Sequence, residues 1–504
     1  MDAATRATIL VAALGIVGLS FAIGWWAKRR ATTTQAFFGA TAMFGPFTTA
    51  LSSMAAVASA FALVGVPGLI YASGNTISLW MLGSPAFALG YLMLGKRVRA
   101  MAEVGPVASL GDLSDLRFGG HRGIKALLSA VLLLGCLSYL ASQVQAGADL
   151  FGHLLGVRPV VAGLVIFGVL TLYTVISGEV GGILTQAFQG MVMVAAGAVV
   201  IVAFFARTGG PGAVLEAVTH AGTVTASGVS KSFSVGLLDA WGTLPGAVAL
   251  AWVVIPVLGV VGQPQVITRM YALKDPRDLP RLSLYVTIAH MVVALMVVLL
   301  GFGVLHLVAT GRVPPLASAD RAIFVFADSL GTLAQVLIYA AVLAAAMSTS
   351  SLFLSLAGGI VSRDLPSAFG VSVPAGRQMP LFRATVLLLG LGSIAFALSS
   401  GEMVAILGAF GYGTLMSATL PVFVLGLLWK RASSQGVLAG LAVALGYNLV
   451  SLILDRRGFV YPGGLPWYVN VVAASLVVTI VVSLFSRDCA GERLDRRVAA
   501  VLDL

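Results

Sequence analysis

Long apolar runs, separated by short polar segments, dominate the chain from about residue 7 to residue 486. A membrane-spanning helix needs roughly 17–25 mainly apolar residues, and thirteen runs approach or exceed that length. They do not alternate apolar and polar positions as the strands of a membrane barrel do. The pattern predicts an all-α integral membrane protein with about 13 transmembrane helices. The runs lie near residues 7–27, 46–71, 78–95, 124–155, 160–177, 182–206, 246–270, 283–308, 332–361, 384–400, 405–429, 436–454 and 468–486.

The composition excludes several other classes of protein. Of the 504 residues, 59% are hydrophobic and only 10% are charged, whereas a soluble domain carries about 25% charged residues. A soluble enzyme, a nucleic-acid-binding module and a single-pass receptor are all incompatible with these values. Two cysteines, Cys136 and Cys489, are too few for a disulfide framework.

The net charge of +11 reflects basic residues in the short loops between the runs. With thirteen spans, 22 of the 30 Lys and Arg residues fall on one side and 8 on the other. Positively charged loops stay in the cytoplasm, so we expect the N-terminus outside and the C-terminus in the cytoplasm of a bacterial-type inner membrane. Lys28-Arg29-Arg30 follows the first span rather than preceding it, which predicts a retained helix and no cleaved signal peptide.

Two spans contain residues that interrupt a helix. The second span has small residues over 52–60 and then Gly65-Val66-Pro67-Gly68, and the seventh contains Gly262-Gln263-Pro264. Either break alone could be a packing kink, but matching breaks in two inverted repeats are typical of a transporter's binding site. We therefore expect six parts: 1–45 (an extra helix and inner loop), 46–206 (first repeat), 207–245 (outer loop), 246–429 (second repeat), 430–486 (two further helices) and 487–504 (cytoplasmic tail).

The spans hold few titratable groups. No Asp or Glu lies at the middle of a span, and a proton relay would have only Asp149, His290 and His306 to use. A sodium site needs no titratable group, and the ninth span offers four successive hydroxyls over 348–351. These hydroxyls either flank an ion or bond back to carbonyls one turn earlier, and the spacing alone favours back-bonding. Arg269 is expected to extend to the inner membrane interface.

Several separated motifs, in their order and spacing, resemble the sodium/solute symporter family, which includes proline, pantothenate, monocarboxylate and sugar carriers. The resemblance runs from about residue 7 to residue 454. The motifs are Gly95-Lys96-Arg97-Val98-Arg99, Ser109-Leu110-Gly111-Asp112-Leu113, Arg117-Phe118-Gly119, Tyr173-Thr174-Val175-Ile176-Ser177-Gly178, Gln189-Gly190, Gly262-Gln263-Pro264-Gln265 with Arg269, Ala345-Ala346-Met347-Ser348-Thr349, and Leu425-Gly426-Leu427-Leu428-Trp429-Lys430-Arg431 with Gly436.

The resemblance implies a five-plus-five inverted-repeat transporter core with broken first helices in each repeat. It also implies that a sodium ion is the coupling ion for uptake by alternating access, which reverses the preference for back-bonded hydroxyls. The implied sodium ligands are the carbonyls of Ala55, Ala58 and Ala345 and the hydroxyls of Ser348 and Thr349.

The resemblance places the solute beside that ion. The implied solute-binding positions are Ser59, Phe61, Tyr139, Gln143, Gln186, Val260, Gln263 and Pro264. Proline carriers have Asp at the positions of Val57 and Gln186, and an aromatic pair at those of Pro256 and Val260. These departures predict a small solute other than proline and leave the strength of sodium coupling open.

We therefore expect a secondary active transporter, not an enzyme, that imports a small polar organic solute together with sodium. Its partners are that solute and the lipid bilayer, and no nucleic acid. The alternatives are a proton-coupled or uncoupled carrier on the same fold, and a transporter-like solute sensor. The sequence identifies neither the solute nor the oligomeric state.

Overall fold

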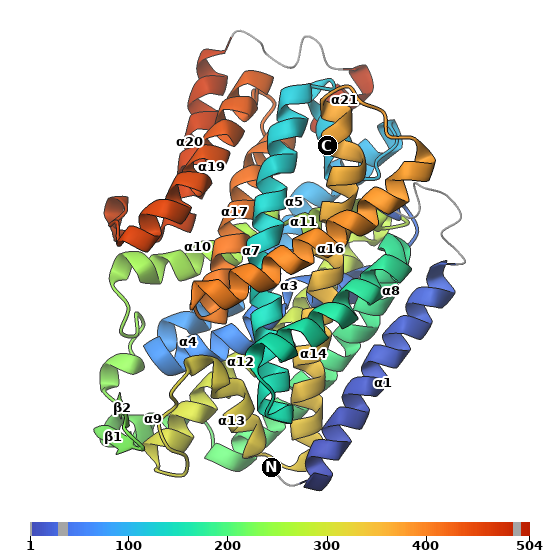
Figure 1. The fold of residues 1–504 in the computed structure, drawn as a ribbon. Helices are drawn as coiled ribbons and strands as arrows, with labels where there is room; N and C mark the ends of the chain where they lie inside the picture. Colours follow the sequence, from blue (N-terminus) through green and yellow to red (C-terminus); the bar gives the residue numbers. More distant parts are fainter. Residues whose placement is uncertain (1–2, 29–38, 487–494) are drawn as a thin grey trace.

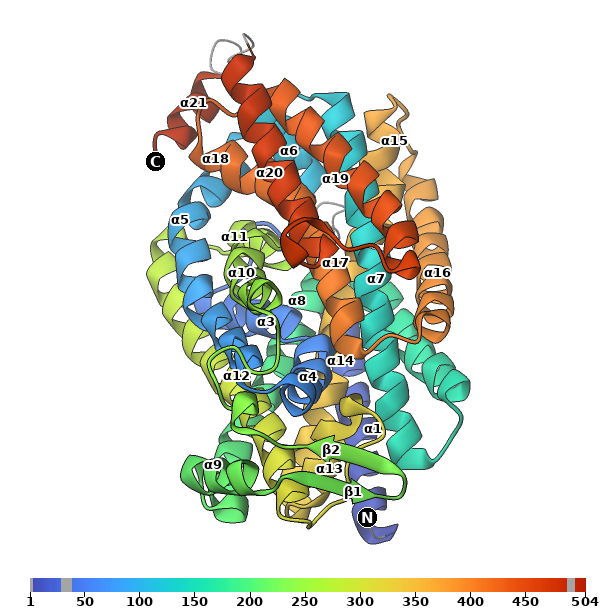
Figure 2. The same cartoon turned by 90° about the vertical axis from the view of Figure 1, so that its left-hand side faces the viewer.

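Helices occupy all thirteen apolar runs (Figure 1). The computed structural model describes residues 3–28, 39–486 and 495–504. Within those ranges, 11 helices are long and apolar enough to cross a membrane, and one bent pair, Pro46–Val57 with Phe61–Ser73, passes that test together. A shorter apolar helix, Val160–Val175, accounts for the remaining run. The two ends of the described chain lie toward opposite ends of the bundle (Figures 1 and 2).

The first half of the chain supplies the spans around the first break. Its elements are α1 (Ala3–Lys28), α3 (Pro46–Val57), η1 (Phe61–Gly65), α4 (Val66–Ser73), η2 (Asn75–Leu82), α5 (Gly83–Val104), α6 (Leu110–Phe118), α7 (Arg122–Leu155), α8 (Pro159–Thr208), α9 (Pro211–His220), β1 (Thr223–Ala226), β2 (Val229–Ser232) and η3 (Val235–Leu237).

The second half begins with the other broken helix. Its elements are α10 (Gly246–Gly262), α11 (Pro264–Ala272), η4 (Pro276–Asp278), α12 (Leu279–Ala309), η5 (Ala319–Arg321), α13 (Ala322–Asp328), α14 (Thr332–Gly359), η6 (Ile360–Asp364), α15 (Leu365–Ala368), α16 (Ala375–Ser400), α17 (Val404–Thr419), η7 (Leu420–Leu425), α18 (Gly426–Leu428), α19 (Ser434–Leu454), η8 (Asp455–Arg457), η9 (Pro462–Gly464), α20 (Trp467–Phe485) and α21 (Arg496–Leu502).

Both expected helix breaks are present. Between α3 and η1 the chain bends by 55°, and Ala58 leaves the helical region with φ −73° and ψ 64°. Between α10 and α11, Gln263 is extended with φ −70° and ψ 142°. The second break follows from the sequence, because Pro264 lacks an N–H and its ring disfavours a helical conformation in the preceding residue.

A third interruption divides α8 into two spans at Gly178. This residue has φ 56° and ψ −169°, a backbone conformation that glycine adopts without steric cost. The chain thereby turns from the helix over Val160–Val175 into the long span Gly178–Thr208.

The segment over 207–245 folds into α9 and a hairpin of β1 and β2, at the end of the bundle where the N-terminus lies (Figure 2). Two residues of this segment, one in β2 and one after it, donate hydrogen bonds to the end of α4. Lys231 Nζ donates to the Ala72 carbonyl at 3.1 Å, and the Thr243 N–H donates to the Ser73 carbonyl at 2.9 Å. The loop between α12 and η5 also reaches α4, because the Leu316 N–H donates to Tyr71 Oη at 3.0 Å.

Glycines on α17 allow the helices around the first break to pack closely. A Cβ added at Gly408 would lie 2.3 Å from the Phe61 ring, and one at Gly411 would lie 2.6 Å from the Tyr139 backbone nitrogen. Atoms at those distances overlap, so both positions require glycine for this packing. The close approach brings α17, η1 and α7 together at the centre of the bundle.

Candidate functional site

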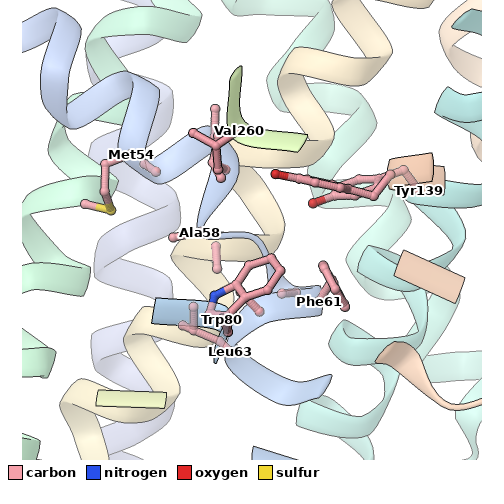
Figure 3. Close-up of a cluster of buried hydrophobic side chains, with 14 of the residues drawn as sticks. Met54, Ala58, Phe61, Leu63, Trp80, Tyr139 and Val260 are labelled. Atoms are coloured by element: carbon pink, nitrogen blue, oxygen red, sulfur yellow. The ribbon is translucent and has the colours of Figure 1, made fainter. Parts of the chain in front are cut away.

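Aromatic side chains from five elements surround the first helix break, and Figure 3 labels Phe61, Trp80 and Tyr139 among them. The Phe61 ring centroid lies 5.1 Å from Trp80, 6.3 Å from Tyr139 and 6.4 Å from Tyr412. Tyr139 also packs on Phe353 of α14, with ring centroids 4.8 Å apart. All five side chains are buried. We call Phe61, Trp80, Tyr139, Phe353 and Tyr412 the aromatic cluster.

Polar groups from α7 bond to the interrupted backbone of the break. Gln143 Oε1 accepts a hydrogen bond from the Ala60 N–H at 2.9 Å, and the Tyr139 and Ser59 hydroxyls are 2.9 Å apart. An interrupted helix leaves backbone groups that must find partners at membrane depth. The structure thus brings together Ser59, Phe61, Tyr139 and Gln143, four of the positions expected at the solute site.

Oxygens of α3 and α14 meet on the other side of the break. Ser348 Oγ donates to the Ala55 carbonyl at 2.7 Å and to the Ala345 carbonyl at 3.0 Å. Thr349 Oγ1 donates to the carbonyl of Ala56 at 3.2 Å, and not to that of Ala58. The hydroxyls therefore reach across to the broken helix, although Ser348 also bonds back to its own helix. Hydroxyl and carbonyl oxygens can replace the water around a monovalent cation, so this donor set fits sodium.

The second break contributes Val260, Gln263 and Pro264, all buried. Figure 3 labels Val260 with Ala58 and Trp80 in one cluster of buried side chains. Gln263 Nε2 donates to the Tyr412 carbonyl at 3.0 Å, which ties this break to α17. Within the described residues, Gln263 Oε1 and Tyr412 Oη are buried without a hydrogen-bond partner. Two unpartnered polar atoms beside the aromatic cluster could serve a bound solute.

Gln186 makes its hydrogen bonds outside the aromatic cluster. Its Oε1 accepts from Ser52 Oγ at 2.9 Å and from Arg269 Nη2 at 2.6 Å. Its Nε2 donates to the Ser348 carbonyl at 3.1 Å and to Ser351 Oγ at 3.2 Å. The expectation that Arg269 extends to the membrane interface was wrong. Its side chain is 0% exposed and pairs with Glu179. Burial is possible because Glu179, Gln186 and Ser52 accept hydrogen bonds from the guanidinium and offset the cost of burying its charge.

Trp80 and Tyr412 join the site without having been expected from the sequence. Both stand in apolar runs, where an aromatic residue is usually part of the core. The Tyr412 ring packs against Gly259, where an added Cβ would lie 1.9 Å from it, so a glycine marks this contact. The role of this glycine is visible only in the folded chain, so no sequence pattern could have identified Trp80 and Tyr412 as site residues.

A cleft lies beside the C-terminal half of α14, toward the end of the bundle where the C-terminus lies. Its lining includes Glu179, Thr268, Ser355 and Asp364. Ser355 stands on α14, two turns beyond the Ser348 hydroxyl. The cleft therefore lies on the C-terminal side of the oxygen set along α14.

Broken helices that place backbone oxygens and an aromatic cluster at the centre of a multi-pass bundle define a secondary transporter. The comparisons with known proteins agree. The model of the sodium:solute symporter family matches residues 37–444, and this chain belongs to that family. It is accordingly a sodium-coupled secondary transporter of small solutes, with sodium as the coupling ion.

Curated relatives match nearly the whole chain. The osmoregulated proline transporter OpuE of Bacillus subtilis is 27% identical over 491 residues, which cover 95% of each chain. A sodium/pantothenate symporter of Haemophilus influenzae is 27% identical over 467 residues, 92% of each chain.

A solved structure shows the same fold. A Na+-coupled sialic acid symporter, solved in a substrate-bound outward-open state, superposes with a TM-score of 0.73 at 16% identity, over 95% of this chain and 98% of that one. The fold is thus the expected five-plus-five inverted-repeat transporter core.

Proposed function

We propose that this chain imports a small polar organic solute with sodium held between α3 and α14. The ligands are the carbonyls of Ala55, Ala58 and Ala345 and the hydroxyls of Ser348 and Thr349. One observation carries this proposal: the Ser348 hydroxyl joins the Ala55 and Ala345 carbonyls within 3.0 Å of its oxygen. Three of the five ligands therefore already lie together.

The ion couples to the solute through the broken helix. Ala55 stands just before the bend, Ala58 and Ser59 form it, and Phe61 stands just after it. An ion that holds α3 against α14 fixes the position of these solute-binding residues. Sodium then favours the conformation that binds solute, and differential binding to two conformations is what couples them.

The residues proposed to contact the solute are Ser59, Phe61, Tyr139, Gln143, Val260, Gln263 and Pro264, with Trp80 and Tyr412 added by the geometry. Gln186, also expected there, is assigned instead to the ion side. The proposed solute-contact residues include no Lys, Arg, Asp or Glu, which favours a neutral or zwitterionic solute with one apolar face. Such a solute could hydrogen-bond to the free Gln263 Oε1 and Tyr412 Oη.

The membrane orientation is proposed from the distribution of basic residues, with the N-terminus outside and the C-terminus in the cytoplasm. The cleft beside Glu179 and Asp364 then faces the cytoplasm. The six-part division of the chain, with repeats over 46–206 and 246–429, completes this arrangement. Modification of single added cysteines at the hairpin and near α21 by a membrane-impermeant reagent in intact cells tests the orientation.

A thermal-shift screen of the purified protein tests the function. Proline, pantothenate, other small acids and sugars are each added in sodium chloride and in choline chloride. A ligand at 100 times its Kd stabilises the folded state by about 2.7 kcal/mol. We expect one solute class to raise the Tm in sodium only. A shift of equal size in choline would contradict sodium coupling. Uptake that persists without sodium and is abolished by a protonophore would indicate a proton-coupled carrier.

A further inference from the structure

A buried arginine lies at the junction of three helices beside the proposed ion site. Arg269 of α11 donates from Nη1 to Glu179 Oε1 at 2.6 Å, from Nη2 to Gln186 Oε1 at 2.6 Å, and from Nε to Ser52 Oγ at 2.9 Å. A charge taken out of water is strongly destabilising unless it is paired and fully hydrogen-bonded. These three contacts supply the pairing and connect α3, α8 and α11.

Gln186 lies between Arg269 and Ser348 and forms hydrogen bonds with both. A guanidinium can only donate hydrogen bonds, so the Gln186 carbonyl oxygen must face Arg269 and its amide nitrogen must face α14. That nitrogen donates to the Ser348 carbonyl at 3.1 Å. Ser348 in turn bonds to Ala55. Contacts therefore run from Glu179 through Arg269 and Gln186 to the backbone carbonyl of Ser348, the residue whose hydroxyl is a proposed sodium ligand.

The charges of Arg269 and Glu179 have opposite effects on a nearby cation. Arg269 carries a fixed positive charge that repels sodium, and Glu179 carries the negative charge that offsets it. Glu179 also lines the cleft that opens on the cytoplasmic side, with its side chain 13% exposed. A movement of α8 or α11 that widens this cleft would separate the two charges. The uncompensated guanidinium would then lower the affinity for sodium on the side where sodium must leave.

From this geometry we infer that Arg269 and Glu179 are a charge pair that sets sodium affinity, acting through Gln186 as positioning residues. This inference rests on the proposed sodium site. It assigns to the pair a role in ion release toward the cytoplasm, where the cleft beside Glu179 opens.

The two single substitutions have effects of opposite sign, which separates this role from a structural one. Glu179→Gln keeps a hydrogen-bond acceptor for Arg269 but leaves the positive charge uncompensated, so the Kd for sodium rises by roughly tenfold. Arg269→Gln leaves the negative charge of Glu179 uncompensated, so the Kd falls. The double variant removes both charges and returns the Kd to near the wild-type value.

The measurement is equilibrium binding of radiolabelled sodium to each purified full-length variant in detergent, without solute. Asp278→Asn is the matched control, because the Asp278 and Arg281 pair lies at the start of α12 with Arg281 exposed, and its Kd should not change. Kd shifts in the same direction for both single variants, or no shift in either, would overturn the inference.

A second variant covers the case in which Arg269→Gln does not fold. Gln186→Glu keeps an acceptor for Arg269 and adds a negative charge, in exchange for the amide donor to the Ser348 carbonyl. The added charge should lower the Kd for sodium, and an unchanged or higher Kd would overturn the inference. Failure of the proposed function gives a different result, since the wild-type protein itself would then bind no sodium.

Discussion

The Ser348 hydroxyl offers the sharpest test of the ion site. Ser348→Ala removes an oxygen that lies 2.7 Å from the Ala55 carbonyl and 3.0 Å from that of Ala345. A hydrogen bond or polar contact to a charged group contributes about 1.5–3 kcal/mol. Loss of this ligand should therefore raise the Kd for sodium by about 10- to 150-fold. Without sodium, the loss of the bond to Ala55 should cost only about 1 kcal/mol of stability.

The neighbouring Ser350 provides a matched control on the same helix. Its hydroxyl is buried and has no hydrogen-bond partner within the described part of the chain. Ser350→Ala removes the same atom type from the same turn without breaking a contact. We expect an unchanged Kd for sodium and an equal or higher Tm, because an unsatisfied buried hydroxyl is itself unfavourable.

Scintillation proximity binding of radiolabelled sodium measures both variants against wild type, with the Tm in sodium and in choline as a second readout. Two results would refute the reasoning. A wild-type Kd in Ser348→Ala would show that the hydroxyl is not a ligand. An equal loss in Ser350→Ala would show that both changes act through the packing of α14.

Three further predictions follow from other contacts. Thr349→Ala should raise the sodium concentration needed for half-maximal uptake more than it changes solute preference, and equal sodium dependence would remove Thr349 from the ion site. Gly408→Ala should lower the free energy of unfolding by about 1–3 kcal/mol in a thermal melting assay, because its Cβ would lie 2.3 Å from the Phe61 ring. Gly446→Ala is the control. Its added Cβ would have nothing within 4 Å, so it should be neutral or stabilising in the same assay. Burial raises the pKa of Asp320 to about 6, from 3.8, so the neutral form favours folding. The Tm of wild type relative to Asp320→Asn should therefore rise as the pH falls from 7 to 4 and stay level above pH 7, and a flat difference would contradict the raised pKa.

Local chemistry explains why the spans and breaks could be predicted from the sequence. A run of apolar residues long enough to cross a bilayer has few alternatives to a helix. Pro264 determines the second break through its own ring and its effect on Gln263. Gly178 permits its turn in the same local way. None of these features depends on a distant part of the chain.

The polar network could not be predicted in this way, because its members come from distant segments. Arg269 is 90 residues from Glu179 and 217 from Ser52. A lone arginine near the end of an apolar run usually extends to the interface, and only the paired carboxylate makes burial possible. The position of Gln186 could not be predicted for the same reason, because its hydrogen-bond partners on α11 and α14 come from distant segments and place it beside the proposed ion site.

Hydrogen bonds from the segment over 207–245 to α4 connect a surface hairpin to the helix that follows the first break. Lys231 and Thr243 hold the last carbonyls of α4, and α4 continues from the bend that carries Ser59 and Phe61. When that helix moves, the hairpin must travel with it or release it. Ser227, at the exposed turn with φ 53°, is a convenient point of attachment. A fluorophore or an antibody fragment placed there would distinguish transport conformations without entering the solute path.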